Sequence, residues 1–397
     1  MNTNQEPQFK SLLDMIDNRS GIGCSGGGAV HSYNDIISIE NLFLAWQEFI
    51  KNKKNKKDVQ EFSLKLSQKI FKLHEDLKNK TYKHSSYEAF KINDPKPRDI
   101  HKASVKDRLC HHAIYRILYP YFDKKFIYDS YSCRIGKGTH KAIYRFESFI
   151  NKVSKNNTKT CWVLKCDIRK FFANIDHEIL KNILTKHIQD IDTLNLLENI
   201  IDSFSSNPIG KAYGVNNSPL IAIVKTGECA KFDFKHFKQK QKLTNSAIAE
   251  NVNNEKGLPL GNLTSQLLVN IYMNEFDQYV KRGLKVKYYI RYADDFVILS
   301  QDKKYLEIIQ TEVANFLKEN LQLELHSDKV FIKTIYSGVD FLGWVHFPTH
   351  RVLRNTTKKR MLRNLKNNEN TKASYLGMLS HGNSFKLQNS IYAITEM

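Results

Sequence analysis

Long hydrophobic runs are missing from this sequence of 397 residues. No apolar stretch approaches the ~18 residues that cross a membrane, and the polar start of the chain lacks the apolar core of a signal peptide. Cysteine is also scarce. The six cysteines form no C-x-x-C pair and no regular spacing, which argues against a disulfide framework and a structural zinc site. These absences predict a soluble protein of the reducing cytoplasm, with no membrane partner.

Acidic residues are few beside basic ones, since 41 Asp and Glu stand against 61 Lys and Arg and leave a net charge of +20. Charge of this sign and size acts on polyanionic partners, so nucleic acid is the first partner to expect and an anionic membrane surface the second. With 41% hydrophobic residues, the chain is typical of a globular protein and not of a disordered one. Its length allows one elaborate domain or two to three smaller ones.

Apolar residues recur at helical spacing in several stretches and form short strand-like runs in others. The first pattern predicts helices over residues 39–50 with Ser38 as the N-cap, 62–77, 107–119, 178–188, 268–279 after Thr264 as the cap, and 305–317. The second predicts strands over residues 87–92, 162–167, 288–292, 296–299, 321–325, 331–335 and 339–345. The fold class expected from this mixture is α+β.

Two segments show no sustained periodicity. Residues 1–34 are interpreted as a flexible N-terminal arm, whose glycines lack the G-K-[ST] sequence of a phosphate-binding loop. Between residues 207 and 256 lysines and phenylalanines interleave. This segment is typical either of an inserted hairpin with a solvated face or of a groove element that pairs charge with stacking rings.

Adjacent carboxylates stand between two apolar runs, where Asp294 and Asp295 form the tip of a predicted hairpin. Like charges at the edge of a buried sheet repel each other, and a divalent metal is the usual compensation; a plain turn is the alternative. Asp167 ends another apolar strand, which antiparallel pairing would bring to the same edge. Three carboxylates there can hold two Mg²⁺ ions, or Mn²⁺ in their place, about 3.5–4 Å apart for phosphoryl transfer.

Five motifs in order give the chain a resemblance to the reverse transcriptases, the RNA-directed DNA polymerases. Tyr292-Ala293-Asp294-Asp295 is similar to the YxDD box of that family, and residues 164–172 (LKCDIRKFF) resemble its first catalytic motif. Residues 257–266 (GLPLGNLTSQ) are similar to the loop that contacts template and nucleotide. His326-Ser327-Asp328-Lys329 resembles the later palm motif, and the primer grip is matched by Phe341-Leu342-Gly343-Trp344.

The resemblance implies a right-hand polymerase with a palm of antiparallel sheet and helices. Fingers are expected over residues 35–160, the palm over 161–344 with 207–256 inserted, and a small helical thumb over 345–397. Asp167 and Asp294 would be the main metal ligands, Asp295 a supporting carboxylate, and the Ile168 carbonyl a further ligand. Two Mg²⁺ ions, or Mn²⁺, would serve as cofactors.

Further roles come from the same resemblance. Phe172 would be the steric gate that selects dNTPs, with a plain core residue as the alternative and Phe171 as the core member of the pair. Lys96 and Arg98 would contact the triphosphate, unless they are solvated charges. Lys329 would protonate the leaving pyrophosphate, unless it is surface charge. The implied nucleotide-binding set also includes Ile168, Leu260, Gly261 and Gln266.

One departure from the common family pattern concerns Leu260, because most intron and retroviral enzymes carry Gln before this glycine. Leu260 resembles the branch of diversity-generating retroelements and defence-associated bacterial enzymes, and a side chain without hydrogen-bonding atoms would leave base selection loose. The expected partners are an RNA template, in particular a non-coding RNA, a DNA primer or product, dNTPs, and a protein partner or second copy. A scaffold without polymerase activity, and template-independent or protein-templated synthesis, are the alternatives.

Overall fold

The computed structural model describes residues 32–93, 97–206, 255–365 and 369–395. Its contacts divide the chain into two compact units, Met1–Lys124 with Lys181–Ser265, and Lys125–Leu180 with Gln266–Met397. Residues 1–31 and 207–254, which hold most of the predicted arm and insertion, lie outside the described residues. Each unit is described by itself below.

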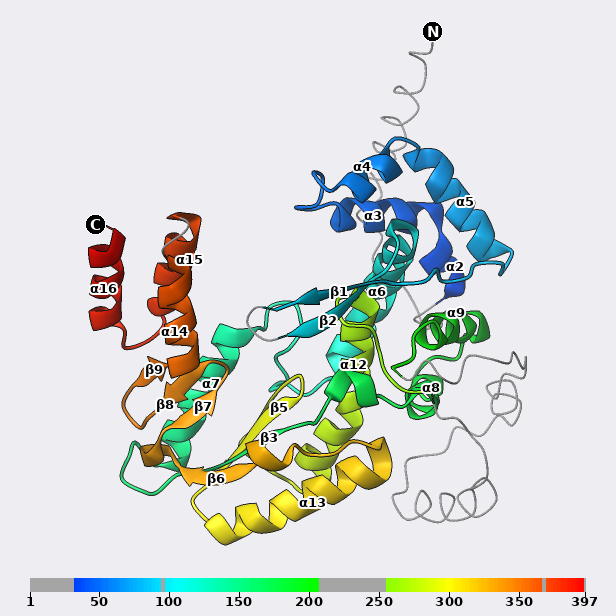
Figure 1. The fold of residues 1–397 in the computed structure, drawn as a ribbon. Helices are drawn as coiled ribbons and strands as arrows, with labels where there is room; N and C mark the ends of the chain where they lie inside the picture. The colour runs from blue at the N-terminus through cyan, green and yellow to red at the C-terminus, as the bar shows by residue number, and fades with distance from the viewer. Residues whose placement is uncertain (1–31, 94–96, 207–254, 366–368, 396–397) are drawn as a thin grey trace, which may run out of the picture. The chain divides into compact units, whose positions relative to one another are not determined.

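Unit 1 begins with helices that share one apolar core. They are α2 (Tyr33–Ile37), α3 (Ile39–Phe49), α4 (Lys57–Ser63), α5 (Leu66–Lys78) and α6 (Val105–Lys125) (Figure 1). The expected N-cap is confirmed, since Ser38 Oγ accepts a hydrogen bond from the Asn41 amide at 3.2 Å. The buried Asn41 amide group donates to the carbonyls of Ile36 and Ala113, which joins α3 to α6.

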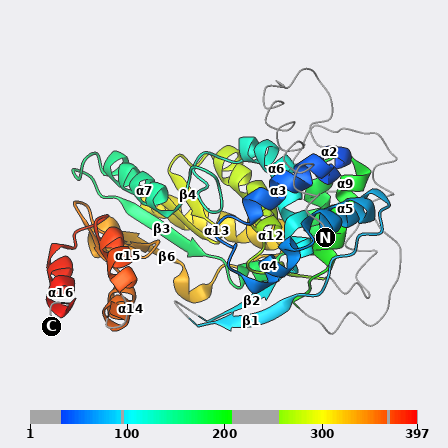
Figure 2. The same ribbon diagram turned by 90° about the horizontal axis from the view of Figure 1, so that it is seen from above.

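The rest of unit 1 comprises a β ribbon, a helix and a loop. Strand β1 (Glu88–Ile92) pairs antiparallel with β2 (Arg98–Lys102), which Figure 2 shows as a separate two-stranded ribbon. Helix α9 (Ile191–Asp202) and strand β2 were not predicted. Helix α8 (His177–Thr185) crosses the boundary between the units.

Unit 2 contains a four-stranded antiparallel sheet in the order β4-β5-β3-β6. Its strands are β3 (Trp162–Asp167), β4 (Tyr289–Tyr292), β5 (Asp295–Ser300) and β6 (Phe331–Thr334). Each was predicted to within two residues, because runs of buried apolar residues favour strands when turn residues bound them. The β4–β5 hairpin turns at Ala293 and Asp294, so the expected hairpin is present, but Asp295, which was expected at its tip, is the first residue of β5.

Helices cover both faces of this sheet. Helix α7 (Thr139–Val153) packs Phe146 and Phe149 against Val163 and Val297 on one face. On the other face Phe276 of α12 (Leu263–Gln278) packs on Phe296, with ring centroids 5.1 Å apart, and α13 (Lys303–Leu321) contacts β3 and β5. Because side chains alternate along a strand, Asp167 and Asp295 share the α7 face with Val163 and Val297.

Short elements complete unit 2. The turns η1 (Phe171–Asn174), η3 (Tyr279–Gly283), η4 (Ser327–Lys329) and η5 (Ile335–Ser337) link the larger elements. A second sheet, in the order β7-β8-β9, consists of β7 (Val339–Phe341), β8 (Trp344–His346) and β9 (Arg351–Leu353). Three helices follow, α14 (Asn355–Asn364), α15 (Glu369–Leu379) and α16 (Phe385–Thr395).

Several sequence predictions need correction. The helix expected over residues 62–77 is broken at Leu64 and Lys65, and the strand expected over 321–325 is the end of α13 followed by a single bridge. The strand expected over 339–345 is a hairpin, because residues 342 and 343 have positive φ angles. Thr264 lies inside α12 and does not cap it. The finger, palm and thumb boundaries stay a prediction.

None of the helices in the described part of the chain is both long and apolar enough to span a membrane. The four cysteines within that part, Cys110, Cys133, Cys161 and Cys166, are free thiols. The expectation of no disulfide therefore holds for these four residues.

Candidate active site

Two of the predicted carboxylates stand opposite each other in the sheet of unit 2. In the antiparallel register of β3 with β5, Asp167 is the partner of Asp295, and Tyr292 of β4 is the partner of Asp295 on its other side. Asp167 is the last residue of β3 and Asp295 is the first of β5. The register therefore brings both side chains to the same end and the same face of the sheet.

Backbone hydrogen bonds hold this end of the sheet. The Ile168 amide donates to the Asp294 carbonyl at 3.1 Å, and the His326 amide donates to the Asp167 carbonyl at 2.8 Å. Ala293 takes a φ of +56° in the turn between β4 and β5. This left-handed conformation is costly for a residue with a Cβ atom, so the turn is fixed by its surroundings. The positions of the three Asp residues are therefore set by the ends of two strands and by one tight turn.

Two lysines face these carboxylates. Lys329 Nζ lies 2.8 Å from Asp167 Oδ1, and Lys165 Nζ lies 3.3 Å from Asp295 Oδ2. The Lys329 side chain is 43% exposed, whereas that of Lys165 is 10% exposed. Lys329 therefore stands at the solvent side of the site and Lys165 inside it.

The pKa of Asp295 is strongly raised. Burial raises its pKa to about 7; the Lys165 ammonium opposes this rise, and the neighbouring charges of Asp294 and Asp167 add to it. The side chain of Asp295 is 18% exposed. An ionised carboxylate in this position is costly without a further positive charge.

The residues present fit a divalent metal. Asp295 Oδ1 is buried and has no hydrogen-bond partner, so one oxygen at the centre of the site is left without compensation. The donors are carboxylate and carbonyl oxygens, the ligand type that Mg²⁺ and Mn²⁺ prefer. Asp167, Asp294, Asp295 and the Ile168 carbonyl are the atoms of this chain that would hold such ions.

The two adjacent phenylalanines differ in burial. Both lie in the turn η1, where Phe171 is buried and Phe172 is half-buried, with ring centroids 5.5 Å apart in an edge-on arrangement. Lys170, which precedes the turn, has a φ of +45°. Phe171 is thus the core member of the pair, as expected, although it sits in a helical turn and not in an extended chain.

The predicted nucleotide loop of unit 1 lies along strand β2. The Leu260 carbonyl accepts a hydrogen bond from the His101 amide at 3.1 Å, and the Asn262 side-chain amide donates to the His101 carbonyl at 3.0 Å. Gly261 has a φ of +104°, and a Cβ there would come 3.1 Å from Ile100. Only glycine fits this approach of the loop to the strand without strain.

Other predicted nucleotide contacts lie on both units. Arg98 begins β2 in unit 1 and is exposed, while Lys96 lies outside the described residues. Gln266 is half-buried within α12, at the start of the unit 2 portion of that helix. Arg98, Leu260 and Gly261 thus share one neighbourhood within unit 1, and the three carboxylates share another within unit 2.

The predicted primer grip is the β7–β8 hairpin of unit 2. Leu342 and Gly343 form its two-residue turn with φ angles of +52° and +90°, and Phe341 pairs with Trp344. Two positive φ angles match the right-handed twist of a tight hairpin. Phe341 and Trp344 are buried in the core of unit 2, whereas the two turn residues between them are half-buried.

Two buried basic residues at the site were missed by sequence reasoning. Lys165 lies two residues before Asp167, and Arg291 lies three before Asp294; both side chains are almost fully buried. A charged residue inside an otherwise apolar strand is the signal that could have found them, because such residues are rarely buried unless paired.

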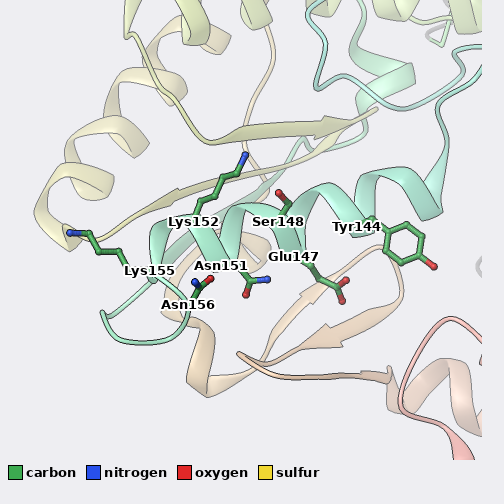
Figure 3. A pocket seen from close by; sticks show the side chains of 7 residues that line it. All are labelled: Tyr144, Glu147, Ser148, Asn151, Lys152, Lys155 and Asn156. Carbon is green, nitrogen blue, oxygen red and sulfur yellow. The ribbon is translucent and has the colours of Figure 1, made fainter.

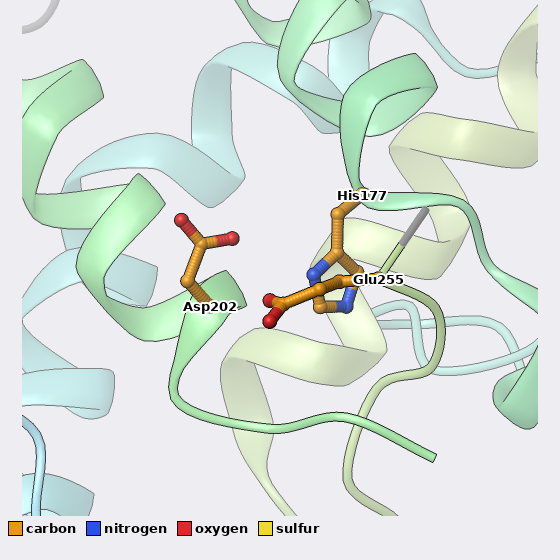
Figure 4. Close-up of side chains that lie close together, drawn as sticks. All are labelled: His177, Asp202 and Glu255. Carbon is orange, nitrogen blue, oxygen red and sulfur yellow. The ribbon is translucent and has the colours of Figure 1, made fainter. Parts of the chain in front are cut away.

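Polar groups also gather away from the carboxylate site. A pocket of about 690 Å³ runs along α7 and is lined by Tyr144, Glu147, Ser148, Asn151, Lys152, Lys155 and Asn156 (Figure 3). In unit 1, oxygens of Asp202 and Glu255 lie within 4.8 Å of each other (Figure 4). Lys181 Nζ lies 2.9 Å from Asp202 and compensates its charge. Neither place includes a predicted site residue.

Carboxylates on adjacent strand ends, with lysines beside them, define a site of the kind that catalyses phosphoryl transfer with bound metal ions. Residues 90–347 match the family described as reverse transcriptase (RNA-dependent DNA polymerase). This match covers more than half of the chain and includes all three carboxylates, so the protein belongs to the reverse transcriptase family.

Curated relatives are distant in sequence. The chain is 24% identical to a putative COX1/OXI3 intron 2 protein of Saccharomyces cerevisiae, over 69% of this chain and 33% of that one. It is also 24% identical to protein YkfC of Escherichia coli (64% and 63%) and to the group II intron-encoded protein LtrA of Lactococcus lactis (74% and 51%). The chain thus spans between a third and 63% of the length of these relatives.

Among solved structures, telomerase from Candida albicans is similar with a TM-score of 0.40 and 11% identity, over 73% of this chain and 51% of that one. Telomerase from Candida tropicalis gives a TM-score of 0.40 and 12% identity, over 67% and 48%.

Proposed function

We propose that this protein is an RNA-directed DNA polymerase that adds dNTPs to a primer. The observation that carries this proposal is the pairing of Asp167 with Asp295 across two strands, beside Asp294, with one oxygen of Asp295 buried and unbonded. Three clustered carboxylates cost free energy in a fold, and catalysis with divalent ions is a reason for keeping them.

Asp167, Asp294, Asp295 and the Ile168 carbonyl would hold two Mg²⁺ ions, or Mn²⁺. When bound, such ions activate the attacking oxygen and stabilise the leaving oxygen in phosphoryl transfer. Lys329 is the proposed donor of a proton to the leaving pyrophosphate, and its exposed position beside Asp167 supports that role. Exclusion of the 2′-hydroxyl of a ribonucleotide is assigned to Phe172.

Substrate binding involves further residues of the chain. Lys96 and Arg98 would bind the triphosphate, while Leu260, Gly261 and Gln266 would lie against the incoming nucleotide and the template. The hairpin of Phe341, Leu342, Gly343 and Trp344 would position the primer end. The net charge of +20 supports a polyanionic template and predicts binding that weakens steeply with salt.

The first test is incorporation of labelled dNTPs by purified protein with Mg²⁺, on its co-purified RNA and on a supplied RNA template with a DNA primer. Asp294→Ala with Asp295→Ala is the inactive variant, and Glu319→Gln, an exposed residue of α13, is the matched control. The proposal is supported if wild type and control incorporate dNTPs and the double variant does not. Treatment with RNase before the reaction should also abolish incorporation. Equal incorporation by the double variant would overturn it.

The biological role that we propose is DNA synthesis in an antiphage defence system, directed by a non-coding RNA. The long segment 207–256 and Ala293 in the YxDD box support this role over that of a diversity-generating retroelement, whereas Leu260 in place of Gln resembles both kinds of enzyme. Sequencing of the DNA product distinguishes them. Product copied from a repeat of a variable gene would favour the retroelement, and product copied from an unrelated RNA would favour defence.

An RNA-binding scaffold without polymerase activity is the competing class of function. Wild type that binds RNA but incorporates no dNTP, on any of the supplied primers and templates, would favour the scaffold. Size-exclusion chromatography with light scattering of the same preparation would test the expected protein partner or second copy.

A further inference from the structure

An arginine of strand β4 lies fully buried behind the carboxylate turn. The Arg291 side chain is 1% exposed. It lies one residue from Tyr292, so the alternation along the strand points it to the face opposite Asp167 and Asp295. That face is covered by α12, whose Asp277 is also fully buried. The site chemistry described above makes no use of this pair.

The guanidinium of Arg291 has defined partners for its donors. Its Nε and Nη2 donate to the two oxygens of Asp277 at 2.8 and 2.6 Å, a two-point ion pair. Nη2 also donates to Ser130 Oγ at 3.1 Å. The remaining nitrogen, Nη1, donates to the Ala293 carbonyl at 3.1 Å. One cation thus joins α12 and residue 130 to the turn between β4 and β5.

This last contact reaches the peptide unit that precedes Asp294. Ala293 holds a φ of +56°, and its carbonyl is fixed by Arg291. On the other side of Asp294, its own carbonyl accepts from the Ile168 amide at 3.1 Å. The backbone of Asp294 is therefore held from both sides, by Arg291 before it and by β3 after it.

The backbone of Arg291 is held in the same way. Its amide donates to the Asp129 carbonyl at 3.0 Å, and its carbonyl accepts from the Tyr131 amide at 2.9 Å. Asp277 is held in turn by Tyr289, whose hydroxyl donates to Oδ1 at 2.7 Å. The turn is therefore supported by two packed parts of the protein, helix α12 and the segment of residues 129–131.

We propose that Arg291 is a positioning residue of the polymerase site, which holds the Ala293 carbonyl and thereby sets the placement of Asp294 and Asp295 for metal binding. The inference rests on the proposed function, because it assigns those carboxylates to metal ions. The alternative is that the Arg291–Asp277 pair only stabilises the core, in which case any replacement that leaves no unpaired charge would preserve metal binding and turnover.

A double variant separates these two roles. Arg291→Met with Asp277→Asn removes both charges together, so no single charge is left buried, which is the main cause of unfolding when one partner of such a pair is lost. Arg291→Lys keeps the charge but replaces the planar fork, whose separate nitrogens reach Asp277 and Ala293, by the single nitrogen of an ammonium. The matched control is Tyr272→Phe, which removes a buried hydroxyl of α12 that donates to the Leu321 carbonyl and leaves the contacts of Arg291 in place.

Three quantities are measured for each variant: thermal unfolding, kcat for dNTP incorporation, and Mn²⁺ affinity by calorimetry with Asp294→Ala as the reference for loss of the site. We expect the double variant to fold, with kcat lower by about 10-fold to 100-fold, because small displacements of catalytic groups have effects of that size. Its Mn²⁺ affinity falls by about 10-fold to 100-fold, the effect expected when residues that orient metal ligands are replaced. Arg291→Lys gives an intermediate loss, and Tyr272→Phe retains the kcat of wild type.

Wild-type kcat and Mn²⁺ affinity in the folded double variant would overturn the inference. Should that variant not fold, Arg291→Lys decides by the same two readouts, and wild-type values for it would equally overturn the inference. Should the wild-type protein show no incorporation, the proposed function fails, yet Mn²⁺ affinity still decides whether Arg291 sets the carboxylate turn.

Discussion

Lys329 Nζ donates a hydrogen bond to Asp167 Oδ1 at 2.8 Å, although the two residues are 162 positions apart. The lysine comes from the short turn η4 and the aspartate from the end of β3. The contact places an exposed proton donor directly beside a proposed metal ligand. This specific contact supports the proposed acid role of Lys329 over the alternative that Lys329 is only a surface charge.

Replacement of Lys329 tests that role. Lys329→Gln is expected to lower kcat by about 100-fold, because general acid catalysis contributes about 10²-fold to 10⁴-fold, while the Kd for primer and template stays close to that of wild type. Steady-state incorporation and filter binding measure the two quantities. Lys333→Gln removes the same charge from an exposed position of β6 and serves as the control; an equal loss of kcat in both variants would contradict the acid role.

The Phe171 and Phe172 pair offers an internal control for sugar selection. Phe172→Ala is expected to raise the kcat/KM for rGTP relative to dGTP by about 10-fold to 200-fold, the range that one steric contact provides. Phe171→Ala, a core truncation, is expected to cost about 3–5 kcal/mol of stability without a change in that ratio. Competition assays and chemical unfolding separate the effects. If the ratio shifts in Phe171→Ala and not in Phe172→Ala, the steric gate is Phe171 and the assignment to Phe172 is wrong.

Fidelity is expected to depend on the side chain of residue 260. Leu260→Gln adds hydrogen-bonding atoms, and the backbone contact of residue 260 to His101 does not depend on the side chain. The misincorporation frequency, measured by sequencing cDNA, should fall several-fold, since a well-made hydrogen bond contributes about 1 kcal/mol. Leu260→Met, similar in size and apolar, should leave the frequency unchanged. An unchanged misincorporation frequency in Leu260→Gln would show that the missing hydrogen-bonding atoms of Leu260 do not cause loose base selection.

A buried histidine predicts loss of stability in acid. Burial lowers the pKa of His346 to about 3, and the nearby Arg351 adds to this effect. In the unfolded chain His346 binds a proton near pH 6.5, whereas in the folded chain it does so only near pH 3. The unfolded state is therefore favoured as the pH falls below 6.5, and the contribution of the neutral histidine to stability is present only above that pH. At pH 5 the loss amounts to about 2 kcal/mol.

Urea unfolding at pH 7.5 and pH 5 checks this prediction. His346→Leu should lose about 2 kcal/mol less than wild type between the two values, because leucine has no proton to bind. Neither ring nitrogen of His346 makes a hydrogen bond of normal length; Glu147 Oε1 lies 3.8 Å from Nδ1 and is also paired with Arg351, so leucine leaves that carboxylate with a partner. The same acid loss in His346→Leu as in wild type would show that other groups carry it.

The strands of the four-stranded sheet of unit 2 could be predicted because the pattern that specifies each of them is local. Buried runs such as residues 162–167 and 296–299 carry their own pattern of apolar residues bounded by turns. The YxDD turn and the end of β3 could be placed for the same reason. Confirmation of the register, in which Asp167 faces Asp295, needed the structure, because pairing depends on contacts between distant segments.

What the sequence could not show depends on such distant contacts. Helix α7 is an exception, because its buried residues Ile143, Phe146 and Ile150 stand at helical spacing, so a local pattern that was present in the sequence was overlooked. The ion pair of Arg291 with Asp277 joins a strand to a helix, and neither residue announces its partner. Similarly, the strand expected over residues 339–345 became a hairpin because a leucine, Leu342, adopts a conformation that usually requires glycine.

The pairing of β3 with β5 makes the site sensitive to a change of chain length that leaves every site residue in place. Deletion of one residue between Trp162 and Asp167 would shift the alternation of side chains by one position. Asp167 could then keep its place opposite Asp295 only if the residues of β3 before the deletion moved to the opposite face of the sheet. An insertion or deletion in β3 is therefore expected to impair the site more than most substitutions of the same residues.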